Sequence, residues 1–327
     1  MTVSWASLLA ERKDYVSLDP LAPVPVLYLA GTSFCGSTLL SFIMNTHPDV
    51  VSIGEISPTR VAEGPEYRCS CGALLKDCPF FRQVREVMAG RFEVTMDPVY
   101  WDLRHRASPN RYLDYFLTSY TLPSRMARAR DVAREWSSRF RKGINHHARR
   151  NEAFIRAVLQ VSGKRLFFDA TKPASRIPLL RRVAGRGLLV IHLVRDPRGY
   201  ALSANRHEGV PWARAARSWL RTNLAVERSV ASLEHHRWLR LRYEDLCREP
   251  ARVLDRITRF AGLDPFPSHD EHTPPAHHII GNQMRLTADS WRTLRLDESW
   301  RRRMPPEARH EVWDIAGRLA GSYGYQL

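Results

Sequence analysis

The stretch Val26–Glu55 constrains the fold of this chain more than any other part of the sequence. It begins with the apolar run Val26–Leu29, continues through a short loop bounded by Gly31 and Gly36, and then shows the apolar spacing of a helix over residues 38–45. In a strand, turn and helix of this kind, backbone N–H groups and the positive end of the helix dipole converge on one point. The sequence therefore predicts a buried strand that ends in an anion-binding loop.

The loop has the spacing of a phosphate-binding loop, G-x-x-x-x-G-S-T. Ser37 stands where a nucleotide-hydrolysing loop carries its lysine, which indicates a ligand other than a nucleoside triphosphate. The apolar residues 50–53 predict a second strand, and Glu55 follows at its carboxyl end. Because ligands of open α/β sheets bind at the carboxyl ends of the strands, we expect this carboxylate to lie near the loop.

Three later apolar runs, at residues 165–168, 188–194 and 238–241, predict further strands, with helix-like segments between them. The run 188–194 is continuous, as in a central parallel strand that is buried on both faces. Strands that alternate with helices form a parallel sheet covered on both sides. We predict an α/β fold with a P-loop-like, doubly wound parallel sheet of four or five strands, in a single domain that covers residues 1–327.

Residues 57–165 show no strand pattern and predict a mostly helical insertion into this domain. Aromatic residues of the insertion, such as Tyr112 and Tyr115, are assigned to a packed core rather than to a substrate platform. Three of its cysteines, Cys69, Cys71 and Cys78, have the spacing C-x-C-x6-C and could supply three zinc ligands. No histidine or fourth cysteine stands near them in the sequence, so a packed loop is preferred and no metal site is predicted.

The composition of the chain limits which class of protein it can be and which kinds of partner it can bind. The chain has 50 Lys and Arg against 34 Asp and Glu, a net charge of +16 that favours polyanionic partners. The N-terminal residues lack a sustained apolar run, and no segment approaches the ~20 apolar residues of a membrane-spanning helix. Five cysteines, sparse and odd in number, fit a reducing compartment. We expect a cytoplasmic protein, and the sequence indicates no oligomeric state.

A second anion site is predicted after the later strands. Lys172 follows the run 165–168, Arg195 comes directly after Val194, and Ser203 lies about two helical turns further on. The guanidinium of Arg195 is a permanent cation whose fork of donors suits a phosphate. Two anion sites on separate strands imply a ligand with phosphate-like groups at both ends, such as a nucleotide substituted at its 3′ and 5′ positions.

These motifs together resemble a known family. The segments GTSFCGSTLL and LVRDPRGYALS, joined by HPDVVSIGE and DATKP, are similar to sulfotransferases that use 3′-phosphoadenosine 5′-phosphosulfate (PAPS). The stretches RYEDL and GN-x-x-R, and the C-x-C…C-P cluster, resemble the bacterial branch, which is similar to carbohydrate and tyrosylprotein sulfotransferases. The resemblance covers residues 26–324 and implies the P-loop-like fold described above.

The resemblance also implies roles for individual residues. It assigns to the donor the residues of the loop and of the 3′-phosphate site, which are Ser33, Phe34, Cys35, Gly36, Ser37, Thr38, Arg195, Ser203 and Arg285. Glu55 matches the base that deprotonates the acceptor hydroxyl, and Lys172 matches a basic residue on the transferring sulfuryl group. In-line transfer needs such a base and such a cation. No metal is implied, because sulfuryl carries less charge than phosphoryl.

One position departs from the family pattern. The family commonly has Lys or Arg two residues before the second glycine of the loop, and this chain has Phe34. The departure is compatible with an inactive descendant, with reliance on Lys172, or with replacement by Arg176, Arg206 or His47. Reliance on Lys172 is the preferred interpretation. The charged residues of RDPR and RYEDL, Asp196, Arg198, Glu244 and Asp245, are assigned structural roles.

The predicted function is thus transfer of a sulfuryl group from PAPS to an acceptor hydroxyl, on a glycan, a glycolipid or a small metabolite. We expect the insertion 57–165 to shape the acceptor site. A P-loop kinase is an alternative that lacks the required lysine. A catalytically silent basic module that binds polyanions such as heparin or nucleic acid is a second alternative, which the net charge of +16 and Phe34 favour.

Overall fold

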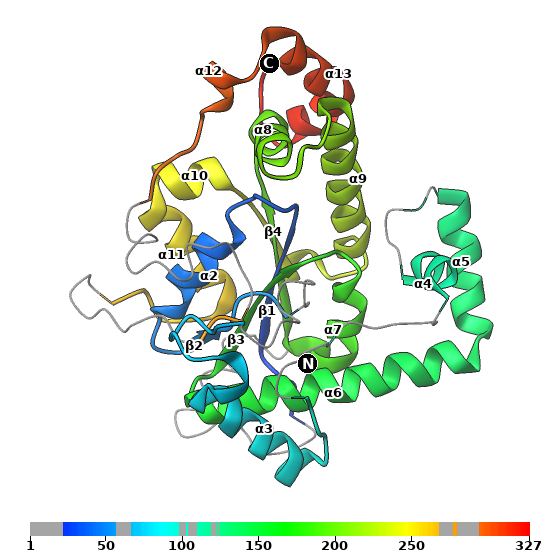
Figure 1. The fold of residues 1–327 in the computed structure, drawn as a ribbon, viewed down its shortest axis with the longest axis vertical. Coiled ribbons are helices and arrows are strands. Elements are labelled where there is room, and N and C mark those ends of the chain that lie inside the picture. Colours follow the sequence, from blue (N-terminus) through cyan, green and yellow to red (C-terminus); the bar gives the residue numbers. More distant parts are fainter. Residues whose placement is uncertain are drawn as a thin grey trace.

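The computed structural model of the chain describes residues 22–56, 67–97, 103, 110–118, 122, 124–267, 277–279 and 294–327. Its centre is a sheet of five parallel strands in the order β2-β3-β1-β4-β5. The strands are β1 (Val26–Gly31), β2 (Val50–Ser52), β3 (Leu166–Lys172), β4 (Leu188–Val194) and β5 (Trp238–Arg242). Figure 1 shows this sheet at the centre of the molecule, with helices on both sides of it.

Helices connect the strands and cover both faces of the sheet. The described helices are α2 (Ser37–Asn45), α3 (Pro79–Phe92), α4 (Arg111–Thr118), α5 (Ser124–Trp136), α6 (Ser138–Ser162), α7 (Arg176–Ala184), α8 (Pro197–Glu208), α9 (Trp212–Val230), α10 (Tyr243–Arg248), α11 (Pro250–Ala261), α12 (Trp300–Arg303) and α13 (Pro306–Ser322). The predicted α/β fold with a doubly wound parallel sheet is confirmed, with five strands.

Side chains of β1 alternate between two hydrophobic cores, since neighbouring residues of a strand point to opposite faces. Leu27 and Leu29 belong to the core under α2 and α11, whereas Val26 and Tyr28 belong to the core under α3, α6 and α7. Every residue of β1 and of β4 is buried. The continuous apolar run 188–194 therefore forms a strand covered on both faces, as its pattern predicts.

His192 interrupts the apolar run of β4 and is fully buried. Its Nε2 atom hydrogen-bonds Asn223 Oδ1 of α9 at 2.9 Å. Burial lowers the pKa of the imidazole from 6.5 to about 4, although the hydrogen bond with Asn223 acts in the opposite direction. Since a buried imidazolium loses its hydration, the folded protein holds this side chain neutral.

The lowered pKa of His192 predicts how the stability of the protein changes at acidic pH. As the pH falls from 6.5 towards 4, the unfolded chain takes up a proton that the folded chain excludes, so the free energy of unfolding decreases. The shift corresponds to a contribution of about 3 kcal/mol to the free energy of unfolding. This contribution is present above pH ~6.5 and is lost as the pH falls to ~4. We expect His192→Gln to remove this part of the pH dependence in urea unfolding. Parallel profiles for the two proteins would contradict the assignment.

The described part of residues 57–165 is mostly helical. The long helix α6 packs against α3 and α7, while α4 and α5 extend away from the sheet beyond one end of α6 (Figure 1). The assignment of the insertion aromatics to a core is wrong for Tyr112 and Tyr115, which are 73% and 59% exposed. The helix α4 instead buries Leu117 against Phe140 and Ile144. That residues 1–327 form one domain stays a prediction.

The C-terminal helices α12 and α13 pack with α8 and α9 around Trp219 and Trp300. Within the described residues, no helix combines the length and the apolar character needed to cross a membrane. The predicted GN-x-x-R stretch at 281–285, with Arg285, lies outside the described residues.

Candidate functional site

The predicted site groups lie along the carboxyl edge of the sheet, in the order of their strands. Glu55 follows β2, Lys172 ends β3, the loop 32–36 follows β1, and Arg195 follows β4. In the sheet, β2 and β3 lie on one side of β1, and β4 and β5 lie on its other side. Ligands of open α/β sheets bind at the switch point between two such halves. The loop 32–36 therefore lies at the switch point of the sheet.

The loop turns sharply into α2 because of its two glycines. Gly36 caps α2 with a φ of 92°, and a Cβ on it would lie 2.7 Å from Cδ2 of Tyr243. A Cβ on Gly31 would lie 2.5 Å from the carbonyl oxygen of Leu193. Both distances are shorter than van der Waals contact, so the close approach of β4 and α10 to the loop requires glycine at both positions.

Gly36→Ala should destabilise the protein and weaken anion binding together. The left-handed backbone alone costs about 1–2 kcal/mol for a residue with a Cβ, and the contact with Tyr243 adds to this. Gly90→Ala is the matched control, because Gly90 is in α3 and a Cβ on it would meet nothing within 4 Å; alanine should stabilise that helix by about 0.5–1 kcal/mol. Urea unfolding measures both changes, and equal effects at the two positions would contradict the role of Gly36.

Phe34 joins the loop to α8. It has a left-handed backbone, with a φ of 57°, and its ring lies 5.7 Å from the ring of His207 and 6.3 Å from that of Tyr200. Its carbonyl oxygen accepts a hydrogen bond from Arg195 Nη1 at 2.8 Å. The position where the family commonly has a cation is therefore filled by an aromatic ring packed on α8.

Two of the residues considered as replacements for that cation are engaged elsewhere. Arg176 is buried and donates from Nε to Asp169 Oδ2 at 2.6 Å. His47 is buried, hydrogen-bonds the carbonyl oxygen of Asp264 at 2.9 Å and packs edge-on against Phe266. Arg206 is exposed on α8. Arg176 and His47 thus have partners of their own, although Nη2 of Arg176 is buried without a hydrogen-bond partner among the described residues. Lys172 is a further buried cation, at the carboxyl end of β3.

Lys172 and Glu55 form an ion pair between the ends of β3 and β2. Lys172 is 9% exposed, and it has a φ of 83°, a strained conformation for a residue with a side chain. Backbone strain of this kind is commonly stored at functional sites. The strand β3 extends four residues beyond the predicted run 165–168, because Asp169 and Thr171 satisfy each other by hydrogen bonds within it. The two predicted catalytic residues therefore lie in direct contact.

Arg195 and Ser203 also lie together as predicted, with Nη1 of the arginine 3.3 Å from Oγ of the serine. The guanidinium is buried, and it stacks over the ring of Tyr243 at 4.8 Å. Its Nη2 atom donates to Asp297 Oδ2 at 2.9 Å. Arg195 is thus held by four parts of the chain: the loop, α8, α10 and the segment before α12.

Sequence reasoning missed Asp297, which lies 102 residues beyond Arg195 in a segment without a motif. Burial raises the pKa of its carboxyl, but hydrogen bonds from Ser299 and the charge and hydrogen bond of Arg195 outweigh burial and leave this pKa lowered. The carboxylate is therefore ionised at neutral pH. It is an anion at the place where the sequence predicts a phosphate.

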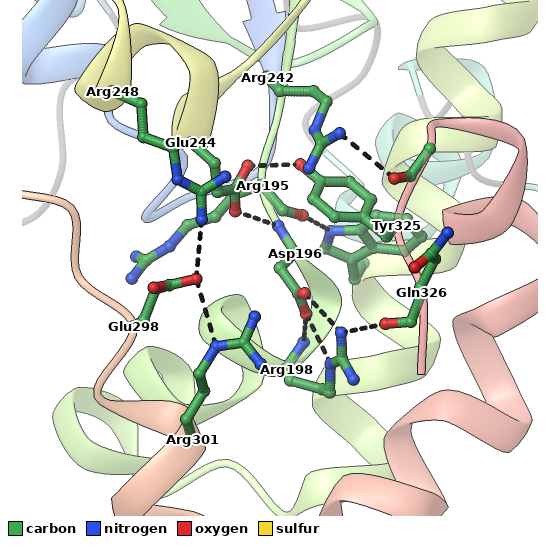
Figure 2. A network of polar contacts seen from close by, with 12 residues as sticks. Arg195, Asp196, Arg198, Arg242, Glu244, Arg248, Glu298, Arg301, Tyr325 and Gln326 are labelled. Carbon is green, nitrogen blue, oxygen red and sulfur yellow. Dashed lines mark hydrogen bonds and ion pairs between the residues drawn. The ribbon is translucent and has the colours of Figure 1, made fainter.

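Asp196 and Arg198 of RDPR, with Arg242 and Glu244 of RYEDL, form a network with the C-terminal tail, shown in Figure 2. Arg198 binds both carboxylate oxygens of Asp196 and the carbonyl oxygen of Gln326. Glu244 accepts from the backbone N–H of Asp196 at 2.9 Å and from Tyr325 Oη at 2.7 Å. These contacts fix the turn that delivers Arg195, which agrees with structural roles for Asp196, Arg198 and Glu244.

Comparison with known proteins shows similarity to sulfotransferases. Residues 118–268 match the model of the Sulfotransferase family. Carbohydrate sulfotransferase 4 of Mus musculus is 26% identical over an alignment that covers 42% of each protein, so the chain matches less than half of the length of this curated relative.

Two solved structures are similar over most of the chain. The sulfotransferase domain of the Synechococcus PCC 7002 olefin synthase is 20% identical, with 96% of this chain and 100% of that chain covered and a TM-score of 0.45. The sulfotransferase domain from the curacin biosynthetic pathway is 18% identical, with 93% and 99% covered and a TM-score of 0.47. The predicted resemblance to sulfotransferases is confirmed by the match of residues 118–268, somewhat less than half of the chain, to the Sulfotransferase family model.

Proposed function

We propose that this protein transfers a sulfuryl group from PAPS to a hydroxyl group of an acceptor. The observation that carries the proposal is the order of groups along the carboxyl edge of the sheet: Glu55, Lys172, the anion loop, and Arg195 with Ser203. A nucleotide with charged groups at its 3′ and 5′ ends would bind with one end at the loop and the other at Arg195. In this arrangement the acceptor would bind at the end of the carboxyl edge where Glu55 lies.

The donor would be held at both of its charged ends. The loop residues 33–38, at the N terminus of α2, would bind the 5′-phosphosulfate through backbone N–H groups and the helix dipole. The 3′-phosphate would bind Arg195 and Ser203, where it displaces the Asp297 carboxylate; Arg285 stays assigned to the same phosphate. Thr32 supports a ligand here, because its buried Oγ1 has no hydrogen-bond partner among the described residues, and such atoms in native proteins usually have one.

Glu55 and Lys172 would carry out the chemistry. The acceptor oxygen attacks sulfur while Glu55 takes the hydroxyl proton, and the bond between sulfur and the bridging oxygen breaks to release 3′-phosphoadenosine 5′-phosphate (PAP). Lys172 would stabilise the charge that develops on the transferring and bridging oxygens. When these oxygens attract Lys172, its ion pair with Glu55 weakens, which frees the carboxylate for the proton. These groups supply the charge stabilisation without a metal ion.

The acceptor is proposed to be a glycan, a glycolipid or a small metabolite. Glu55 is followed directly by the insertion 57–165, which supports a role of this insertion in shaping the acceptor side. The net charge of +16 would also attract an anionic acceptor. The proposed compartment is the cytoplasm, on the basis of the cysteine content.

The proposal is tested by calorimetry with PAP, AMP and Mg·ATP, followed by transfer of labelled sulfate from PAPS to a panel of glycan, phenolic and lipid hydroxyls. We expect PAP to bind more tightly than AMP, and label to appear in an acceptor. Absence of PAP binding would overturn the proposal. Turnover of Mg·ATP would instead favour a kinase, and heparin binding without nucleotide binding would favour a silent polyanion-binding module.

A further inference from the structure

Three cysteines and a histidine that are distant in the sequence meet beside the N terminus of α3. The Sγ atoms of Cys69, Cys71 and Cys78 and a ring nitrogen of His277 all lie within 4.8 Å of one another. The expectation that no histidine completes the cysteine set is therefore wrong. His277 is 199 residues beyond Cys78, in the segment 277–279 after α11, so the spacing in the sequence could not show it.

Three of the distances between these atoms are close to the edges of a zinc-centred tetrahedron. Cys71 Sγ lies 3.7 Å from Cys78 Sγ, and His277 Nδ1 lies 3.3 Å from Cys78 Sγ and 3.6 Å from Cys69 Sγ. Zn–S bonds of ~2.3 Å and Zn–N bonds of ~2.0–2.1 Å at tetrahedral angles place two sulfurs ~3.8 Å apart and a sulfur and a nitrogen ~3.5 Å apart. The four atoms, all within 4.8 Å of one another, are thus close enough for small side-chain movements to bring them onto one ion.

The backbone around the cluster is built to present the ligands. A tight turn carries Cys69 and Cys71, closed by the hydrogen bond from Gly72 N–H to the carbonyl oxygen of Cys69 at 2.9 Å, and Gly72 has a φ of 89°. Cys78 is the N-cap residue of α3, where the helix dipole favours a thiolate. The ring of Phe80 stacks on His277 at 4.7 Å and fixes the orientation of the imidazole.

Packing alone does not account for this arrangement. Cys69 and Cys78 are fully buried, but Cys71 is exposed and gains little from an apolar environment. The polar nitrogen of His277 also points at two buried sulfurs. Convergence of four soft donors on one point is the arrangement that a thiophilic metal requires.

We propose that Cys69, Cys71, Cys78 and His277 bind a structural zinc ion. Three thiolates and one imidazole are a donor set for zinc rather than for magnesium or calcium. Because the protein supplies all four ligands, the ion has no open position for substrate and serves stability rather than catalysis. The inference is independent of the donor nucleotide and of the acceptor.

The ion would fasten the segment 277–279 to the strand that leads to Glu55. The backbone N–H of Ile279 donates to the carbonyl oxygen of Ile53 at 2.8 Å, and that of His278 donates to Ser70 Oγ at 2.8 Å. The ring of His278 also hydrogen-bonds Ser41 Oγ of α2 at 2.9 Å. Zinc would therefore link the cysteine turn, the end of β2 and α2, close in sequence to the 281–285 stretch.

The test is metal analysis of the full chain, purified under reducing conditions without chelator. We expect about one zinc ion per chain, as four protein ligands complete one site, and a tetrahedral thiolate spectrum after replacement by Co²⁺. His277→Ala should lose the metal and lower the melting temperature. His277→Cys should keep the metal, with a Co²⁺ spectrum shifted towards four thiolates.

Matched controls come from a cysteine and a histidine outside the cluster. Cys247→Ser and His310→Ala should keep the zinc content of the wild-type chain. The proposal is overturned if zinc content is equally low in the wild type and in Cys78→Ser, if the Co²⁺ spectrum is octahedral, or if iron with acid-labile sulfide occupies the site. A Cys71–Cys78 disulfide in a zinc-free chain would also overturn it. The Co²⁺ spectrum of the wild-type chain tests the proposed zinc site even if a variant does not fold.

Discussion

Replacing Glu55 by glutamine is expected to lower the rate of sulfuryl transfer by about 10²- to 10⁴-fold, the contribution typical of a general base. Glutamine keeps the size of the side chain, but it cannot take the proton of the acceptor hydroxyl. The dissociation constant of PAPS should change little, because β3 lies between β2, which leads to Glu55, and β1, which leads to the anion loop. Single-turnover transfer of label from saturating PAPS measures the rate, and calorimetry measures the binding.

Glu227→Gln is the matched control for this experiment. Glu227 is also a partly buried carboxylate in an ion pair, at 2.9 Å from Arg240, but it lies in α9 away from the predicted groups. It should therefore retain the full rate of transfer. An unchanged rate in Glu55→Gln would remove Glu55 from the mechanism, even if PAPS proves to be the donor.

Replacing Arg195 by methionine should weaken the binding of PAP by at least ~30-fold, because truncating one partner of a buried charge pair costs about 2–5 kcal/mol. The loss should be specific for the 3′-phosphate. Adenosine 5′-phosphosulfate, which lacks that phosphate, should bind the wild type and the variant with similar affinity. Calorimetry with both nucleotides separates this effect from a general disturbance of the site, and an equal loss for both would contradict the assignment of Arg195.

Asp297→Asn should change PAP binding in the opposite direction. The wild-type carboxylate holds Arg195 at 2.9 Å and competes with the 3′-phosphate for it. Since the Asp297 side chain is 48% exposed and its charge is screened, the gain should stay within about 1 kcal/mol, or roughly fivefold. Weaker PAP binding in this variant would mean that Asp297 supports the site instead of competing with the ligand.

Much of the fold was predictable because buried strands and helices have characteristic patterns of apolar residues in the sequence. The run 188–194 became β4 with the predicted bounds, and Gly262 ends α11 as the sequence indicates. The end of β3 was not predictable in the same way. Asp169 and Thr171 look like loop residues, but they remain in the strand because each satisfies the other by hydrogen bonds.

The site was predictable as far as it depends on strand ends. Lys172, the loop and Arg195 follow apolar runs, and parallel strands bring their carboxyl ends to one edge. The partners of these groups were not predictable, because contacts of Arg195 with Asp297 and of Phe34 with His207 arise between segments with no shared pattern. The loss of the usual loop cation was visible in the sequence, but its structural explanation was not.

The sequence by itself determined the succession of strands and helices along the chain and the position of the glycine-bounded loop, since these depend on local periodicity and on glycine spacing. Only the tertiary structure decided which polar side chains from distant segments meet. It paired Glu55 with Lys172, placed Asp297 on Arg195, and brought His277 to Cys78, 199 residues before it. Such contacts depend on where each loop lies after the helices have packed on the sheet. The packing of the helices is a property of the whole chain, not of a local segment.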